Sequence, residues 1–241
     1  MQQFTIKNPG ESFIKFLLEL EFELKLNSFS NRKSHSFDFF DIKGNKALKA
    51  SLPLNLSIPK EECKLFEYSN QYQNLGNQFC LALIQAGESA LGIIEDNELR
   101  EYKVIRKYMV RKKQGKAQLK HLNTKGKSKA GSRIRLAQSQ RFFEEINQKL
   151  TQWQSIIDNG LFVYGIAASL LPFWLSSNVP IPVDIKDFER ARKVNWTVGL
   201  PRENELEKSI RHLYSSRLSI FDSQIFEEVK SKLEQYLYIY G

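Results

Sequence analysis

Three apolar runs decide the fold that this sequence predicts, and they lie together at residues 79–113, FCLALIQAGESALGIIEDNELREYKVIRKYMVRKK. Gly87 separates the first run from the second, and the turn pair Asp96-Asn97 separates the second from the third. In the third run, side chains alternate between two faces, with Tyr102, Val104 and Arg106 on one and Lys103, Ile105 and Lys107 on the other. We therefore expect an antiparallel meander of three strands, with basic side chains on both faces of the third.

Downstream of this meander, helical and extended patterns alternate. A helix with Ser132 as its N-cap is expected to run to about Ile157, because its apolar residues recur every three or four positions at Phe142, Ile146, Leu150 and Trp153. A short strand at 161–165 leads into a helical stretch that ends near Ser176, and two more helices cover 203–214 and the region from Ile225. This order predicts an α/β sandwich around a mixed sheet.

The first 77 residues carry weaker signals. Residues 12–26, SFIKFLLELEFELKL, fit either a helix or a long strand, and residues 27–36 have the polar composition of a loop. Residues 47–58, ALKASLPLNLSI, alternate like a strand, and Pro53 favours a place at a sheet edge. We assign residues 1–77 to an accessory segment that either completes the fold or forms a module of its own, and residues 78–241 to the main domain with its C-terminal helix.

Basic charge is concentrated in one segment. The chain of 241 residues has 36 Lys plus Arg against 27 Asp plus Glu, a net charge of +9. Residues 103–141 contain 14 Lys or Arg and no Asp or Glu, which leaves 22 basic against 27 acidic residues elsewhere. A strongly basic, acid-free segment indicates a polyanionic partner such as RNA. Its glycines, Gly115, Gly126 and Gly131, indicate a solvated loop.

Other sequence features favour a cytoplasmic protein without a metal centre or a membrane span. Cys63 and Cys80 lie far apart and have no neighbouring ligand pattern for zinc, so neither a metal nor another cofactor is expected. The N-terminus lacks the apolar region of a signal peptide. The longest apolar stretch, 161–175, is short for a membrane helix and contains Gly165 and Pro172, so a buried strand running into a helix is expected there.

The run at 108–146, YMVRKKQGKAQLKHLNTKGKSKAGSRIRLAQSQRFFEEI, resembles the release-factor domain of the ribosome-quality-control peptidyl-tRNA hydrolases. That family includes an ankyrin-repeat and zinc-finger protein of eukaryotes and stand-alone bacterial relatives. In that family, a strand that ends in a Tyr-x-Val-Arg-like motif enters a Gly-x-x-Gln loop. A stretch of Lys and Ser residues that ends in Ala-Gly-Ser then leads into a helix that starts with Arg. The matching positions here are Tyr108, Val110, Arg111, Gly115, Gln118, Lys127, Ala130, Gly131, Ser132 and Arg135. The middle of the loop is Lys116-Ala117, where archaeal and eukaryotic termination factors place a glycine directly before the glutamine.

The resemblance implies a ribonuclease-H-like, release-factor middle-domain-like fold and an enzyme that hydrolyses the ester of peptidyl-tRNA on stalled large ribosomal subunits. Gln118 and Gly115 would be the catalytic residues, with the loop inserted into the peptidyl-transferase centre. Peptidyl-tRNA, ribosomal RNA and the large subunit would be the partners, and neither DNA nor a membrane is expected. The residues that would contact RNA are Arg111, Lys112, Lys113, Lys116, Lys120, Lys125, Lys127, Lys129, Arg133 and Arg135.

Two other functions stay open at this stage. A non-catalytic ribosome- or tRNA-binding rescue accessory protein would keep the basic segment for docking, and the Lys116-Ala117 pair is compatible with it. A metal-dependent nuclease would need clustered carboxylates, for which Asp184, Asp187 and Glu189 are the available set. Their place in a loop favours turn and cap roles instead. His121 has no neighbouring nucleophile or ligand partner, so we assign it no chemistry.

Overall fold

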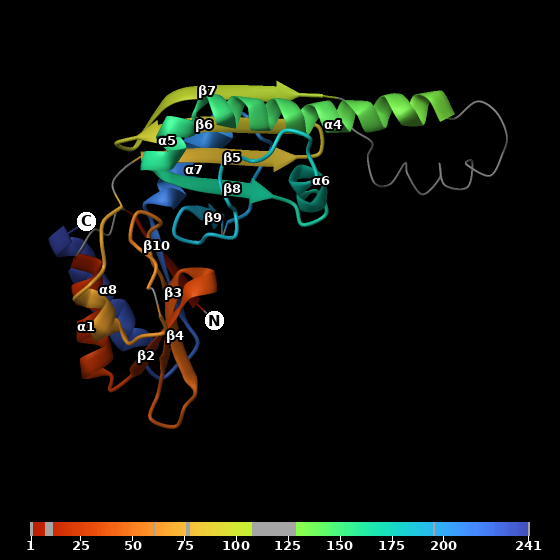
Figure 1. The fold of residues 1–241 in the computed structure, drawn as a ribbon. Helices are drawn as coiled ribbons and strands as arrows, with labels where there is room; N and C mark the ends of the chain where they lie inside the picture. The colour runs from red at the N-terminus through yellow and green to blue at the C-terminus, as the bar shows by residue number, and fades with distance from the viewer. Residues whose placement is uncertain are drawn as a thin grey trace. The chain divides into compact units, whose positions relative to one another are not determined.

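The computed structural model contains two compact units, one formed by residues 1–76 and 209–241 and the other by 77–208. It describes the backbone of residues 2–7, 12–59, 61–75, 78–107, 129–194 and 196–240, and the side chains of these residues except 129–137 and 240. We call these the first and second units (Figure 1).

A mixed five-stranded sheet forms the centre of the second unit. Its strands are β5 (Gln78–Gln85), β6 (Glu88–Glu95), β7 (Glu98–Arg106), β8 (Leu161–Ile166) and β9 (Ala191–Lys193), in the order β7-β6-β5-β8-β9. β5, β6 and β7 pair antiparallel, whereas β5–β8 and β8–β9 are parallel pairs. The predicted meander and the short strand at Leu161 are therefore confirmed.

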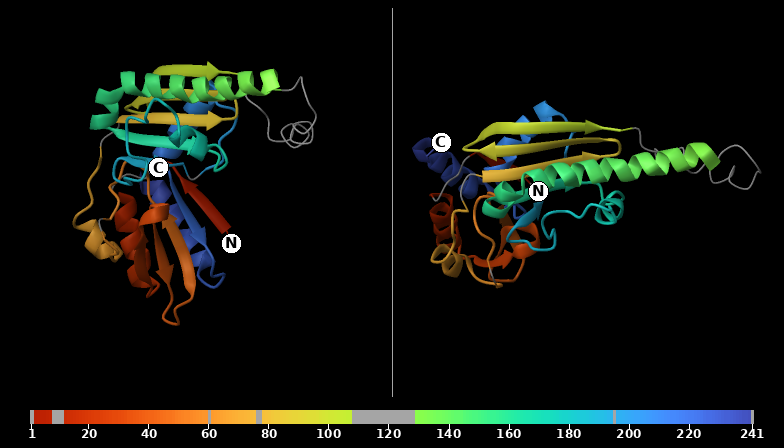
Figure 2. Two further views of the ribbon diagram at one scale, coloured as in Figure 1. Left: turned by 45° about the vertical axis from the view of Figure 1, so that its right-hand side comes forward. Right: turned by 45° about the horizontal axis from the view of Figure 1, so that its top comes forward.

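Helices cover both faces of this sheet, as Figures 1 and 2 show. On one face, α4 (Lys129–Gln152), α5 (Gln154–Asn159) and α6 (Leu171–Leu175) share a core with Cys80, Ala82 and Ile84. On the other face lies α7 (Glu203–Leu213), and a Cβ added to Gly92 of β6 would lie 3.2 Å from the Leu206 side chain. Glycine at position 92 thus lets α7 pack close to the sheet.

The first unit has an antiparallel sheet with helices on one face. Its strand order is β1 (Gln2–Ile6), β10 (Ser216–Ile220), β4 (Lys46–Ser51), β3 (Ser36–Phe40) and β2 (Asn27–Asn31). A 3₁₀ turn, η1 (Arg32–Ser34), joins β2 to β3. The core packs α1 (Ser12–Glu23), α2 (Leu65–Ser69) and α8 (Phe226–Tyr240) against the sheet.

The structure corrects several predictions for this unit. The stretch 12–26, which fitted either a helix or a strand, is helical over Ser12–Glu23 as α1. The predicted loop at 27–36 is wrong, because these residues include β2 and η1. The predicted edge strand is wrong as well: β4 is the central strand and ends at Ser51, two residues before Pro53. The proline therefore lies outside the ladder and removes none of its hydrogen bonds.

The C-terminal part of the chain joins the first unit, whereas the sequence-based division placed residues 78–241 together. The physical reason is β10, which lies between β1 and β4 and pairs with both. The α/β class is confirmed, but a second five-stranded sheet was not predicted. Which unit carries which function stays a prediction.

The long helix also differs from its prediction at both ends. α4 already includes Lys129, so Ser132 lies inside the helix and is not its N-cap. At the other end α4 stops at Gln152, and a separate helix α5 follows a break at Trp153. The Trp153 backbone departs from helical geometry with ψ 17°, while its 4% exposed side chain packs in the core. Within the part of the chain that the structure describes, no helix is long and apolar enough to cross a membrane.

Candidate functional site

Strand β7 leads into the basic segment, and its two faces contact different helices. On one face Ile105 is 2% exposed and belongs to the core beneath α4. On the other face the Tyr102 hydroxyl donates a 2.7 Å hydrogen bond to Oε2 of Glu203 in α7. The predicted alternation of β7 is thus confirmed, and its basic residues lie on both faces. The backbone amide of Lys107 then donates to the Gly87 carbonyl at 2.9 Å, which ties the strand's exit to the turn between β5 and β6.

Two ion pairs fix the direction of α4 along β7. Lys107 Nζ lies 2.6 Å from Oε2 of Glu145, and Lys149 Nζ lies 2.9 Å from Oε1 of Glu101. Lys149 also lies over the Trp153 ring, 4.4 Å from its centroid. The later strand residue meets the earlier helix residue, so α4 runs antiparallel to β7. The hydrogen bond from Lys149 holds the pKa of Glu101 below its ordinary value.

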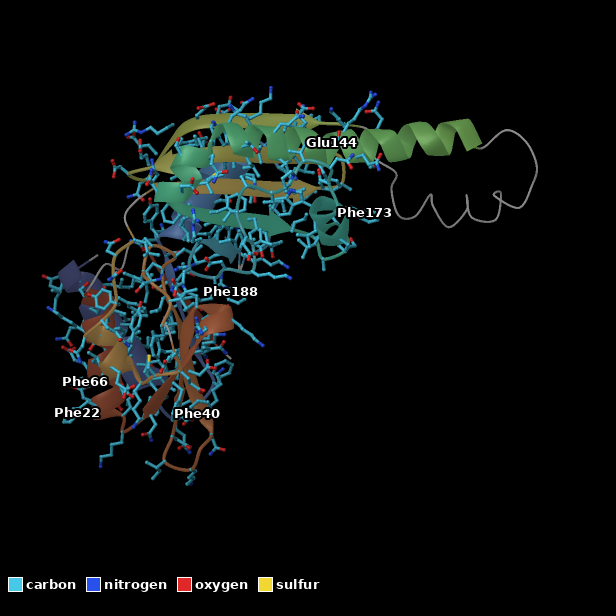
Figure 3. All side chains as sticks on the ribbon, in the orientation of Figure 1. Phe22, Phe40, Phe66, Glu144, Phe173 and Phe188 are labelled. Carbon is cyan, nitrogen blue, oxygen red and sulfur yellow. The ribbon has the colours of Figure 1, made fainter. Side chains whose placement is uncertain are left out.

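A buried amide joins α4 to the segment that follows β8. Asn147 is fully buried among apolar residues of α4, and its Oδ1 accepts a 2.7 Å hydrogen bond from the Trp174 indole of α6. Its Nδ2 donates to the Val179 carbonyl, also at 2.7 Å. One turn earlier, Asn178 Nδ2 donates to Oε1 of Glu144 at 2.6 Å. Figure 3 labels Glu144 on α4. These bonds fix the rotation of α4 about its axis.

The amino-terminal part of α4 extends beyond the end of the sheet (Figure 1). Lys107, one residue after the end of β7, pairs with Glu145 of α4. Glu145 is 16 positions after Lys129, the first residue of α4. At 1.5 Å per residue, the helix reaches about 24 Å past that point. Residues 108–128 of the basic segment therefore follow Lys107, at the exit of β7, and precede Lys129, at the tip of a projecting helix.

The predicted catalytic residues lie between these two ends, outside the described residues. This holds for Gly115 and Gln118 and for His121. It holds equally for seven predicted RNA-contacting residues: Arg111, Lys112, Lys113, Lys116, Lys120, Lys125 and Lys127. The helix α4 contains the other three, which are Lys129, Arg133 and Arg135. Their roles stay predictions, and what the structure describes is the frame that holds the segment.

The carboxylates considered for a nuclease have local structural roles. Asp184 Oδ1 accepts from the Lys186 amide, and Asp187 Oδ1 accepts from the Glu189 amide, each at 2.9 Å. The predicted turn and cap roles are confirmed for the two aspartates. Among the described residues there is no group of three His, Cys, Asp or Glu side chains placed to hold a metal ion.

A cleft that sequence reasoning missed opens at the carboxyl ends of β5, β8 and β9. Its volume is about 730 Å³, and its lining includes Ile84, Ile166, Phe173 and Lys193. Phe173 on α6 is 57% exposed (Figure 3). β7 runs in the same direction as β5, because both pair antiparallel with β6. The basic segment therefore leaves the sheet at the same end, where the carboxyl ends of these strands lie. Open α/β sheets bind ligands at the carboxyl ends of their strands.

A family model described as the Bacteroidetes VLRF1 release factor matches residues 79–220, which is more than half of the chain. The chain belongs to this release-factor family. The resemblance inferred from the run at 108–146 is thereby confirmed. The matched region includes β5 to β9, α4 to α7 and β10, and therefore the whole second unit from Phe79 onward.

The structural comparison gave a more distant likeness. A solved structure titled "Vms1 mitochondrial localization core" shares 12% sequence identity and a TM-score of 0.44 with this chain, over 87% of this chain and 84% of that one. No curated protein matched the chain.

Sequence reasoning also missed the partners of Asn147. The available signal was an asparagine on the apolar face of a helix, one position after Ile146 and three before Leu150. A buried amide needs partners for both its oxygen and its nitrogen. Which residues supply them depends on the tertiary fold.

Proposed function

We propose that this release-factor family member is a peptidyl-tRNA hydrolase, and that the loop Gly115–Gln118 acts in the peptidyl-transferase centre of stalled large ribosomal subunits. The observation that carries the proposal is the position of this loop. It lies inside the region that matches the release-factor family, and inside an acid-free segment with 14 basic residues. The setting we propose is the cytoplasm.

The proposed reaction is hydrolysis of the ester that joins the nascent chain to the tRNA. A water oxygen bonds to the ester carbonyl carbon, the bond from that carbon to the terminal ribose oxygen breaks, and that oxygen takes up a proton. The Gln118 amide is neither basic nor acidic enough to take the proton from water at neutral pH. We infer that it positions the water and donates a hydrogen bond to the oxyanion, a contribution of several kcal/mol in comparable sites.

Gly115 serves the approach to the reacting ester. Without a Cβ, it gives the backbone access to conformations that other residues rarely adopt, and it leaves room next to RNA. The ribosomal RNA and the terminal 2′-OH of the tRNA supply the rest of the site, so we expect the free protein to be a poor esterase.

The basic residues would hold the loop against RNA by neutralising phosphates. Such contacts are largely independent of sequence and weaken as salt rises. The frame supports this reach, because α4 projects about 24 Å beyond Lys107. The acidic residues at the base of the projection have partners within the protein: Glu145 pairs with Lys107, and Glu144 accepts from Asn178.

Peptide release from isolated large subunits that carry peptidyl-tRNA tests the proposal. We expect Gln118→Ala to abolish release while subunit binding in co-sedimentation stays at the wild-type level. Gln114→Ala is the matched control, because it removes an amide four residues away in the same segment and should leave release intact.

The same two measurements separate the other candidate functions. Subunit binding by the wild-type protein without any peptide release would make it a non-catalytic rescue accessory protein. Shortened tRNA in place of freed peptide, with loss of the activity on chelation, would make it a nuclease.

A further inference from the structure

The sheet of the first unit has one face that no helix covers among the described residues. Strand side chains alternate between faces, and Phe37, Phe39, Leu48 and Ala50 point into the core with α1, α2 and α8. The opposite face, which we call the open face, carries the side chains between them. In Figure 3, Phe22 and Phe66 lie on the helical side of this unit, whereas Phe40 lies on the sheet. Most of this sheet, β1 to β4, is outside the region that matches the release-factor family.

Aromatic and basic side chains occur together on the open face. The pairing register places Phe29 opposite Asp38, and Asp38 opposite Lys49. In the row on one side of this one, Phe40 lies opposite Lys46, and in the row on the other side Arg217 of β10 lies opposite Ser51. Three cations and two phenylalanines thus occupy adjacent strands, with Asp38 as the only acidic residue among the outward positions of the five described strands.

Two aromatic rings on this face are exposed, and one of them lies close to a cation. The Phe29 and Phe40 ring centroids lie 6.1 Å apart in an edge-to-face arrangement. Phe221, just after β10, is 41% exposed, as is Phe29. Lys46 Nζ lies 5.2 Å from the Phe221 centroid and 2.8 Å from Oδ1 of Asp38. The Lys46 ammonium group thus lies near one exposed ring, where it would neutralise a phosphate of RNA bound on this face.

A hollow of about 870 Å³ continues the open face at the β2 edge. Phe29, Phe40, Arg32 and Lys33 line part of it. Asp38, Asp41 and Glu62 also line it. Asp38 is paired with Lys46, and Asp41 Oδ1 accepts from the backbone amides of Lys43 and Asn45, each at 2.8 Å. The hollow thus combines two phenylalanines with two basic and three acidic residues, so we expect the RNA to bind on the face of the sheet and not in the hollow.

Charge distinguishes the two sides of the first unit. The outward strand positions and η1 together carry five basic residues and one acidic residue. The three helices that cover the opposite face carry three Lys and seven Glu. A polyanion is therefore attracted to the open face and repelled from the helical face.

We propose that the open face binds single-stranded RNA. Exposed aromatic rings on a sheet stack on bases only when those bases are unpaired, and interleaved lysines and arginines neutralise the phosphates between them. This gives the protein a second RNA contact apart from the basic segment. The inference does not depend on hydrolysis by Gln118, because binding is measured with RNA alone.

Equilibrium binding of the full chain to a labelled, unstructured 12-nucleotide RNA, measured over a salt series, tests the proposal. Phe29→Ala combined with Lys49→Gln should weaken binding about tenfold, since one stacking contact alone is worth about that factor. The slope of log affinity against log salt should fall by about 0.7, the value expected when the protein neutralises one phosphate fewer on a single strand. Phe29→Tyr keeps the ring and should bind as the wild type does.

A matched control comes from the helical face, where Phe22→Ala combined with Lys15→Gln changes the same residue types on α1. This variant should bind RNA as the wild type does. With 4-thiouridine in the RNA, the proposal predicts photocross-links to peptides from β2 and β3 as well as to the basic segment. Circular dichroism melting curves establish that each variant is folded.

Equal RNA affinity of the open-face and helical-face double variants would overturn the proposal, as would cross-links confined to residues 108–137. A third outcome is loss of large-subunit binding with unchanged affinity for free RNA. This result would mean that the open face binds a ribosomal protein, and it would also overturn the proposal that this face binds RNA. A Gln118→Ala protein that no longer releases peptide but binds RNA normally leaves the proposal standing.

Discussion

Replacing Asn147 by alanine should destabilise the second unit strongly. The Trp174 indole N–H and the Val179 carbonyl each have a 2.7 Å bond to the Asn147 amide, and both Asn147 and Trp174 are fully buried. The substitution leaves the fully buried indole N–H and the part-buried Val179 carbonyl without that partner, at about 1–3 kcal/mol each. We therefore expect the free energy of unfolding to fall by about 2–5 kcal/mol, a large part of the stability of a domain.

Urea unfolding followed by tryptophan fluorescence measures the stability of the second unit specifically. All three tryptophans, Trp153, Trp174 and Trp196, belong to the second unit, so their emission reports that unit. Asn159→Ala is the matched control: its Nδ2 donates to the Ser155 carbonyl at 2.8 Å on an exposed surface, so its removal should cost less than about 0.5 kcal/mol. Equal, small losses for both variants would refute the argument that the buried amide holds α4.

Three further predictions concern the second unit. Gly160→Ala should destabilise it by about 1–3 kcal/mol, measured by urea unfolding, because the added Cβ would lie 2.7 Å from the Gln78 backbone oxygen, which cannot rotate away. Burial raises the pKa of the Cys80 thiol, so this cysteine should not react with a thiol reagent until urea unfolds the protein, and rapid labelling of the native protein would contradict this. The lowered pKa of Glu101, hydrogen-bonded by Lys149, predicts a stabilising effect that is complete above the ordinary value of 4.5 and is lost as pH falls through the lowered value. The difference in urea midpoint between wild type and Glu101→Gln should accordingly shrink between neutral pH and pH of about 3.

Much of the second unit could be predicted because its signals are local. The alternation along β7 repeats every two residues, and the apolar positions of α4 recur every three or four, so a short window reveals each element. The turn pair Asp96-Asn97 separates β6 and β7, and both residues adopt positive φ, at 51° and 67°. Local periodicity and turn residues thus identified the meander.

The first unit was harder to predict because its pairing is remote in sequence. β10 pairs with β1 and β4, so residues 216–220 complete a sheet that begins at residue 2. β2 carries the polar sequence NSFSN, which has the composition of a loop and forms a strand through its pairing with β3. Tertiary pairing overrode local composition in both strands.

The candidate site divides in the same way. The basic segment and the Gly115–Gln118 loop could be recognised from composition and resemblance, since both are properties of contiguous sequence. The break at Trp153 and the bonds of Asn147 could not. Trp153 packs in the core of the second unit, and the partners of Asn147 lie on α6 and in the loop that follows it. The Ser132 cap was wrong for a related reason: a serine near a helix start fits several positions, and α4 already includes Lys129.

The central claim concerns one amide, and the most direct measurement compares single-turnover peptide release by the Gln118→Ala and Gln114→Ala proteins on the same large subunits carrying peptidyl-tRNA. The proposed function predicts wild-type release by Gln114→Ala and none above background by Gln118→Ala, with equal subunit binding by both. Release by Gln118→Ala at the rate of its control would contradict it.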